Sequence, residues 1–531
     1  MITRGRGLAA LLAAAAAVLI AAPTASAEMG IDASYAGDGA AEALFGDYLL
    51  DDGVIAADGD RAVAAATLYR DGTTRIGVLR FDETGQPDLA FDGNGRVVLP
   101  PGGEFAEVAS IAVDAVGSVY VLGTDASNGT GATSLLRLRP NGALDTGFGD
   151  SGSLQLSFGP GSRGGGFDLA LDSAGQIVVT GFAVSDVPGR GRDVSILRLD
   201  DAGELDPSFG AGGRVVFGTE DYEVGRSVAS LADRGACVGV QANGSFSSHA
   251  TAACVDDAGA VTLAPEQSPG GGFDSYWGDV AALPQGGFAT SATIDGGGMV
   301  AVESSLLDDW WNYPSTGSGW NGTDARALTA VDDSRALIVG SATAGPGTGY
   351  EPTWMLVDSA VRREDPIDAL RVPQDDSDDA YAAALGVAMD EAGRALTLVR
   401  GESNDLSVAR VELDLPDPVD PRDPEKPPKL ILGRLRMPDT LGGLLRRGTR
   451  FSALCTADCS LRTELVASKR TASRLGLRNR VVDRFHGSLE GGVKGFVRMP
   501  VRGGVARKAR IARLTPGDLG LRVRSQAKFR P

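Results

Sequence analysis

The sequence is poor in the residues from which many active sites are built. Only two histidines, His249 and His486, and four cysteines occur in 531 residues. Neither histidine lies in a motif such as G-x-S-x-G or H-E-x-x-H, so the sequence does not indicate a nucleophilic triad or a metalloprotease. Structural zinc needs four ligands, and the few cysteines and histidines favour disulfides instead. A binding or structural protein is therefore better supported than an enzyme.

Long apolar runs are missing beyond the N-terminus. Residues 1–27 carry Arg4 and Arg6, then an apolar run and the ending A-S-A, which is typical of a cleavable secretory signal. We predict cleavage before Glu28. No later stretch is apolar over the about 18 residues that a spanning helix needs, so we expect a secreted, extracellular protein without a membrane span.

The cysteines are spaced as two near pairs. Outside the cell, an even number of cysteines with such spacing predicts disulfides. We expect one disulfide between Cys237 and Cys254, on adjacent strands, and a second at the neck of a hairpin that contains Cys455 and Cys459.

Positive charge is scarce in most of the chain and concentrated at its end. Residues 429–531 hold 24 Lys and Arg against 6 Asp and Glu, whereas the whole chain has 50 and 69. Between the acidic and basic parts lies DLPDPVDPRDPEKPP at 414–428, in which six positions are proline. This composition predicts an extended linker between two domains.

A short motif recurs along the acidic part. Residues 136–149 read LRLRPNGALDTGFG, residues 197–210 read LRLDDAGELDPSFG, and residues 79–92 read LRFDETGQPDLAFD. A fourth copy, IDASYAGDG at 31–39, has tyrosine in place of phenylalanine. The aromatic positions lie 56, 57 and 61 residues apart, and a nearly fixed period of this size indicates a repeat architecture. These positions are Tyr35, Phe91, Phe148 and Phe209.

Each unit also contains two apolar runs joined by a polar turn, as in LALDSAGQIVVTG at 169–181, which is the pattern of a β-hairpin. Seven such hairpins occur. Each has a preceding strand such as GRVVL (95–99) and a following strand such as LLRLR (135–139). Four antiparallel strands repeated seven times predict an all-β fold, a seven-bladed β-propeller over residues 28–413.

The pattern LRLxxxGxLDxxFGxxGxV, followed by a hairpin with DxxGxIxVxG, resembles the delta-60 repeat of bacterial exported proteins. The match is close over residues 78–217 and looser over 218–413. The resemblance implies a propeller-like β domain and supplies no catalytic residues. Residues 429–531 resemble a basic β-rich domain at the C-terminus of actinobacterial exported proteins, and we expect a small β-sandwich-like fold there.

The recurring motif LDxxFG can be interpreted as a structural element between blades or as a loop that binds an ion. Asp145 and Asp206 suit the cap of a single helical turn, with Gly210 at its exit and the apolar Leu205 and Phe209 filling the gap between blades. An EF-hand-like calcium loop would need further acidic positions that are not present. We favour the structural role and expect no cofactor, with a calcium ion in another geometry as the alternative.

The segment LLDDWWNYPSTGSGWNGTDAR at 306–326 is unusually rich in aromatic residues. Exposed aromatics with polar neighbours suit stacking on sugar rings or a protein contact, and cover of a blade edge is the simpler alternative. The candidate ligand-binding residues are Trp310, Trp311, Tyr313 and Trp320.

These observations favour a secreted, non-enzymatic propeller that acts as a binding or structural module. The basic C-terminal domain suits anionic polymers of the cell envelope better than nucleic acid, and an extracellular protein or glycan is a further candidate partner. The alternative is an extracellular glycan hydrolase or lyase with its site on the propeller axis, where Asp, His, Arg or Tyr would have to converge. The sequence names neither ligand nor oligomeric state.

Overall fold

The structure is a computed structural model in which the chain divides into two units, Met1–Asp414 and Leu415–Pro531. The predicted signal peptide lies outside the described residues. The residues described are 28–43, 45–99, 107–125, 132–159, 164–184, 191–218, 222–231, 235–243, 248–263, 275–284, 287–294, 297–303, 311–312, 321–332, 335–343, 350–358, 368–371, 382–401, 405–414, 430–432, 449–455, 459–467, 471, 473, 481–489, 494–499 and 521–529.

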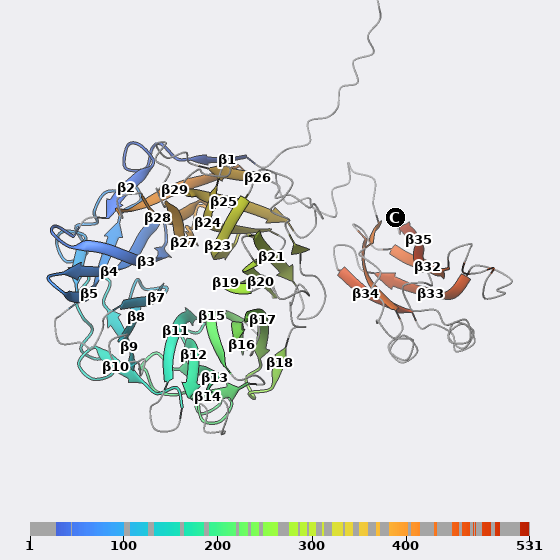
Figure 1. Cartoon of the computed structure of the whole chain (residues 1–531), viewed down its shortest axis with the longest axis horizontal. Helices are drawn as coiled ribbons and strands as arrows, with labels where there is room; N and C mark the ends of the chain where they lie inside the picture. The colour runs from blue at the N-terminus through green and yellow to red at the C-terminus, as the bar shows by residue number, and fades with distance from the viewer. Residues whose placement is uncertain are drawn as a thin grey trace, which may run out of the picture. The chain divides into compact units, whose positions relative to one another are not determined.

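The described part of the first unit consists of antiparallel sheets, and their innermost strands contact one another in a closed ring (Figure 1). The predicted all-β propeller is confirmed. Six sheets have four strands in sequence order. They are β3 (Leu49–Asp58), β4 (Arg61–Arg70), β5 (Thr73–Phe81), β6 (Arg96–Val98); β7 (Glu107–Val113), β8 (Val119–Asp125), β9 (Ala132–Leu138), β10 (Ser153–Leu156); β11 (Gly164–Leu171), β12 (Ile177–Val184), β13 (Arg192–Leu199), β14 (Arg214–Phe217); β15 (Glu223–Leu231), β16 (Gly235–Asn243), β17 (Ser248–Val255), β18 (Val261–Leu263); β19 (Ser275–Ala282), β20 (Phe288–Ile294), β21 (Gly297–Glu303), β22 (Trp311–Asn312); and β23 (Asn321–Ala330), β24 (Arg335–Thr343), β25 (Tyr350–Asp358), β26 (Asp368–Arg371).

The seventh sheet is built from both ends of the unit. Strands β27 (Ala383–Met389), β28 (Ala395–Arg400) and β29 (Leu406–Asp414) come from its C-terminal end. The outer edge of β29 pairs with β1 (Glu28–Ile31) and β2 (Ala40–Ala43) from its N-terminal end. Backbone hydrogen bonds between the two ends therefore close the ring.

This closure corrects the predicted unit boundaries. The sequence repeat places GRVVL (95–99) at the start of a blade, but β6 pairs with β5 as the outermost strand of the preceding sheet. Each sheet therefore begins with the hairpin strand nearest the axis. The predicted repeat units are displaced by one strand relative to the sheets, because the N-terminal segment supplies the outermost strand of the last sheet.

The middle strands are buried on both faces, as their continuous apolar runs predict. All but the last residue of β12 is buried, and side chains of neighbouring sheets form shared clusters. In one cluster Tyr120 and Leu122 of β8 pack with Ile177 and Val179 of β12. Packing of sheet against sheet explains why these strands lack an alternating polar face.

The hairpin turns follow from their sequence. In the turn between β7 and β8, the Asp114 carboxylate accepts hydrogen bonds from the N–H groups of Val116 and Ser118 at 3.0 and 2.8 Å. Gly117 has φ 85°, a conformation that favours glycine. Asp-x-x-Gly is therefore a turn signature in which the aspartate replaces missing backbone partners.

The disulfide Cys237–Cys254 joins β16 to β17, at directly opposed positions with Cα atoms 4.0 Å apart, and confirms the first predicted pair. Cys459 is also disulfide-bonded, whereas the side chain of Cys455 lies outside the described residues.

The described part of the second unit holds two three-stranded sheets. In β32 (Cys459–Val466) alternate residues are buried up to Leu465, so one face of its sheet packs inward. The predicted β-sandwich-like packing of this domain remains a prediction. The other strands are β30 (Leu430–Leu432), β31 (Thr449–Cys455) and β34 (Lys494–Met499) in one sheet, and β33 (Val481–Leu489) and β35 (Arg522–Phe529) beside β32 in the other.

Candidate functional site

The LDxxFG motif and its tyrosine-containing copy, together called the rim motif, lie where neighbouring sheets meet. We call each of these contacts between sheets a seam. Its four aromatic side chains are all fully buried. The Asp145 carboxylate accepts a hydrogen bond from the N–H of Gly147 at 3.3 Å, and that of Asp206 accepts one from the N–H of Ser208 at 2.9 Å. The aromatic residues are Tyr35, Phe91, Phe148 and Phe209.

An arginine from the third strand of the sheet completes each seam. The Arg137 guanidinium lies 4.7 Å from the centre of the Phe148 ring, and its Nε donates to the Asp145 carboxylate at 2.8 Å. Its Nη1 donates to the Asp201 carbonyl in the next sheet at 2.6 Å. One arginine thus joins the ring, the cap and the neighbouring sheet. Arg80, Arg198 and Arg410 make the matching contacts with Asp88 and Phe91, Asp206 and Phe209, and Asp32 and Tyr35.

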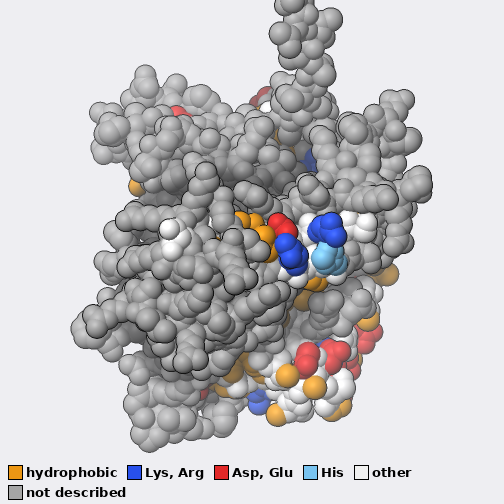
Figure 2. All heavy atoms as spheres, turned by 90° about the vertical axis from the view of Figure 1, so that its right-hand side faces the viewer, with side chains coloured by type: hydrophobic (Ala, Val, Ile, Leu, Met, Phe, Trp, Pro, Cys, Tyr) orange, Lys and Arg blue, Asp and Glu red, His pale blue; other side chains and the backbone are white. Residues whose placement is uncertain are grey.

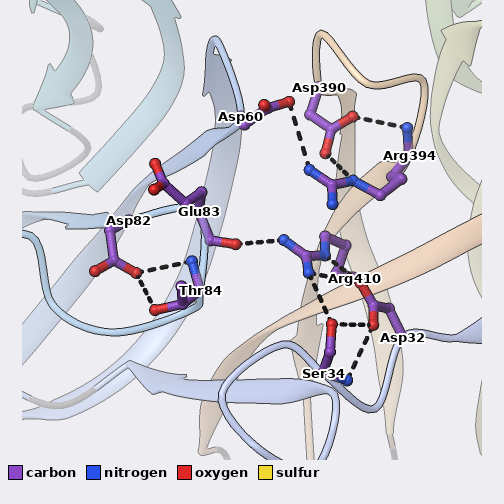
Figure 3. A network of polar contacts seen from close by, with 9 residues as sticks. All are labelled: Asp32, Ser34, Asp60, Asp82, Glu83, Thr84, Asp390, Arg394 and Arg410. Carbon is purple, nitrogen blue, oxygen red and sulfur yellow. Dashed lines mark hydrogen bonds and ion pairs between the residues drawn. The ribbon is translucent and has the colours of Figure 1, made fainter.

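The seam that closes the ring is of the same kind (Figure 3). Arg410 on β29 donates to the Asp32 carboxylate at 2.6 Å and to the Glu83 carbonyl of the first sheet at 2.5 Å. Both ionic side chains are buried, with exposed fractions of 4% for Arg410 and 6% for Asp32. Burial also raises the pKa of Tyr35, whose hydroxyl has no hydrogen-bond partner among the described residues.

One detail of the predicted rim is wrong. Leu205 was expected to face the seam together with Phe209, but its exposed fraction is 40%. The reason is its backbone, because Leu205 pairs antiparallel with Leu199, and the turn bond runs from the Phe209 N–H to the Asp206 carbonyl. In this copy Phe209, and not Leu205, is buried in the seam.

The rim carboxylates are therefore engaged within the protein. Hydrogen bonds from the Ser208 hydroxyl and N–H, with the charge of Arg198, lower the pKa of Asp206 to about 2. Among the described residues, no group of three acidic, histidine or cysteine side chains is arranged to hold a metal ion.

The predicted aromatic site lies largely outside the described residues. This holds for Trp310, Tyr313 and Trp320, while Trp311 lies opposite Val300 in β22 with its side chain undescribed. Trp354 in β25 is a core residue, since its Nε1 donates to the Thr397 hydroxyl at 2.9 Å and its side chain is buried.

The axis carries ionisable groups that do not belong to the rim motif. Innermost strands have a β-bulge, and in β11 the residue after it is Asp168. Its Oδ2 accepts the Val228 N–H from the next sheet at 2.7 Å, and its Oδ1 accepts the Ser110 hydroxyl from the preceding sheet at 2.6 Å. Asp279 of β19 bonds in the same way to the Leu328 N–H at 3.0 Å.

These two carboxyls are electrostatically unlike the rim carboxylates. Burial raises the pKa of Asp168 to about 6. Burial together with the negative charge of Asp168 raises the pKa of Asp279 to about 7. No arginine of the described residues contributes to the pKa of either carboxyl, and raised pKa values of this kind are common at binding and catalytic sites.

Two arginines and three aromatic rings form a stacked group close to this position, which we call the Arg–aromatic ladder. The guanidinium of Arg226, on the bulge of β15, lies 4.5 Å from the Phe167 ring centre on the bulge of β11. Phe167 packs on Phe182 with centres 5.8 Å apart. Arg192 then stacks on Phe182 at 3.9 Å and on Tyr222 at 4.8 Å.

In the second unit, exposed polar residues of β32 and β33 form a row on one sheet face. Arg462 donates from Nε to His486 Nε2 at 2.8 Å, and Arg484 pairs with Glu464 at 2.8 Å. Figure 2 shows a histidine side chain next to basic ones at the surface.

Comparisons with known proteins agree with the fold. A family model described as "Domain of unknown function (DUF5122) beta-propeller" matches residues 117–148, which run from the turn before β8 to Phe148. The chain is a β-propeller protein. No curated protein matches this propeller chain. Among the described residues, no helix is long and apolar enough to span a membrane.

Several solved propellers are similar to this one at low identity. The β-propeller domain of the trilobed protease from Pyrococcus furiosus is 9% identical with TM-score 0.41, over 72% of this chain and all of that one. An acylaminoacyl peptidase from Pyrococcus horikoshii is 8% identical with TM-score 0.41, over 77% of this chain and 57% of that chain. The PQQ-bound aldose sugar dehydrogenase from Streptomyces coelicolor is 13% identical with TM-score 0.34, over 60% and 93%. This chain thus spans little more than half the length of the peptidase, and these similarities do not identify an activity.

Sequence reasoning missed the rim arginines and the axial groups for different reasons. The arginine stands in every quoted copy of the LRL element, so its repetition was a usable signal. Asp168 and Asp279 occupy the position where Ser110 and Ser227 stand in the neighbouring sheets. Alignment of the hairpins would have shown this variation, but not that the carboxyls bond to backbone N–H groups of the neighbouring sheets.

Proposed function

We propose that the protein is a secreted, non-catalytic β-propeller that binds a component of the cell envelope. The observation that carries the non-catalytic part is the bonding of the axial carboxyls. Asp168 and Asp279 accept backbone N–H groups of the adjacent sheets and so join blades. A general base or nucleophile needs a free oxygen within reach of its substrate.

The envelope-binding role is assigned to the basic C-terminal domain. Its net positive charge suits anionic polymers, which bind through many weak contacts to Lys and Arg and respond strongly to salt. The row of Arg462, Arg484 and His486 on one sheet face is a described part of this charge. The aromatic segment around Trp311 is retained as a second proposed contact, for a glycan or an extracellular protein.

Sedimentation with purified cell walls tests this role. The full mature chain should sediment with the walls at low salt and be released as salt rises. The double variant Arg462→Gln/Arg484→Gln should be released at lower salt, and Arg75→Gln/Arg96→Gln in the propeller should behave as the wild type. Failure of the wild type to sediment at low salt would reject the proposal. Replacement of Trp310, Trp311 and Trp320 by Ala tests the second contact in the same assay.

An extracellular glycan hydrolase or lyase is the second candidate. It is favoured by the raised pKa values of Asp168 and Asp279, because an acid with a pKa near neutrality suits proton transfer. Release of reducing ends from envelope glycans by the wild type, abolished in Asp279→Asn, would establish it. Equal release by both proteins would reject it.

A further inference from the structure

The two cations of the Arg–aromatic ladder stack on aromatic rings. Among the described residues, no carboxylate forms an ion pair with Arg192 or Arg226, and their contacts are with aromatic rings. The rim arginines differ, since Arg80, Arg137, Arg198 and Arg410 each pair with an aspartate.

This arrangement has an electrostatic cost. Burial lowers the pKa of the Arg226 guanidinium, and the positive charge of Arg192 lowers it further. Two like charges that act on each other in this way destabilise the fold unless something compensates them. Arg226 is nevertheless the one exposed residue in the otherwise buried first part of β15, so its guanidinium can be reached from solvent.

Stacking on rings also determines what these arginines can bind. A guanidinium that lies over an aromatic face keeps its N–H edge free, and this planar fork matches the two oxygens of a carboxylate or phosphoryl group. The rings fix the orientation of both forks, so less side-chain entropy is lost when an anion binds.

We propose that Arg192 and Arg226 form a binding site for an oxyanion, the carboxylate or phosphoryl group of a small ligand, held between the sheets β11–β14 and β15–β18. The site goes beyond the envelope-binding function and does not depend on it. Phe167, Phe182 and Tyr222 position the two guanidiniums, and the ligand supplies the missing negative charge.

Calorimetric titration of the mature protein at low salt tests the proposal, with inorganic phosphate and D-glucuronate as separate probes. Saturable binding of phosphate would assign a phosphoryl ligand, and saturable binding of glucuronate a carboxylate ligand. Arg226→Gln and Arg192→Gln should each weaken that binding by at least about ten-fold. Arg226→Lys, which keeps the charge but loses the fork, should weaken it less. Arg75→Gln, with the same loss of charge on β5, should bind as the wild type.

Stability separates a binding role from a structural one. Because Arg226→Gln removes the repulsion, its melting temperature without ligand should equal or exceed that of the wild type. A fall of several degrees would contradict the proposal, since it would make the arginine a structural residue. Absence of saturable binding for both probes, or binding that neither variant weakens, would also overturn it.

Discussion

The seams at the rim and the bulges at the axis differ in whether their described charged side chains form ion pairs. At the rim each arginine meets an aspartate, an aromatic face and a carbonyl of the next sheet, as Arg137 does with Asp145 and Phe148. At the axis, within the part of the chain that the structure describes, Asp168 forms no ion pair with an arginine and Arg226 forms none with a carboxylate. The repeated arginines maintain the fold through these pairs, whereas the unrepeated Arg192 and Arg226 are the residues that we propose for a ligand.

The largest effect is expected at the closing seam. Arg410→Ala leaves the Asp32 carboxylate buried without its partner, which costs about 3–5 kcal/mol of unfolding free energy. Urea denaturation measures it. Arg139→Ala is the control, because Arg139 also pairs with an aspartate but its side chain is 54% exposed, and it should cost less than about 1 kcal/mol. Equal losses for the two variants would show that burial does not decide the strength of these pairs.

The disulfide strengthens a sheet that lacks the rim motif after its third strand. The Cys237→Ala/Cys254→Ala variant opens a link across 17 residues and should lower the unfolding free energy by about 3 kcal/mol. Hydrogen exchange should show the loss first in β16 and β17. Uniform exchange across all sheets would contradict a local role for this link.

The axial carboxyls should destabilise the protein as pH rises. Their folded pKa values, about 6 for Asp168 and about 7 for Asp279, exceed the unfolded value near 3.9, so the folded state binds these protons more tightly. The unfolding free energy should therefore fall as the pH rises from about pH 4 to pH 7. Asp168→Asn/Asp279→Asn should flatten this slope. An unchanged slope in the double variant would place its origin elsewhere.

The smallest effect is expected at the seam that contains Tyr35. The Tyr35 hydroxyl is buried and finds no partner among the described residues, whereas phenylalanine occupies the other three seams. Tyr35→Phe should raise the unfolding free energy by about 1 kcal/mol, because it removes an unsatisfied polar group. Lower stability in thermal denaturation would mean that the hydroxyl has a favourable contact.

The sequence predicted the parts of the fold that repeat. The period of Phe91, Phe148 and Phe209 gave the seams, and the apolar hairpins gave the sheets. It did not predict that the N-terminal segment closes the last sheet, because strand pairing between residues some 380 positions apart leaves no local pattern; Glu28 pairs with Asp414.

The candidate site was hidden for a related reason. Asp168, Phe167 and Arg226 each look like ordinary strand residues in the sequence. Only the bulges of β11 and β15 bring the ring and the guanidinium together, 4.5 Å apart. Repetition predicts structure well, but contacts between unlike residues of neighbouring sheets depend on the register of each sheet.

The most direct test of the contrast between rim and axis is the unfolding free energy of two matched variants, Arg198→Gln and Arg226→Gln. Each removes one arginine that stacks on a phenylalanine, at 4.6 Å from Phe209 and 4.5 Å from Phe167. Arg198→Gln should lose about 3 kcal/mol, because Asp206 stays behind without its partner. Arg226→Gln should lose nothing. Equal losses in the two variants would contradict the division between structural rim and ligand-binding axis.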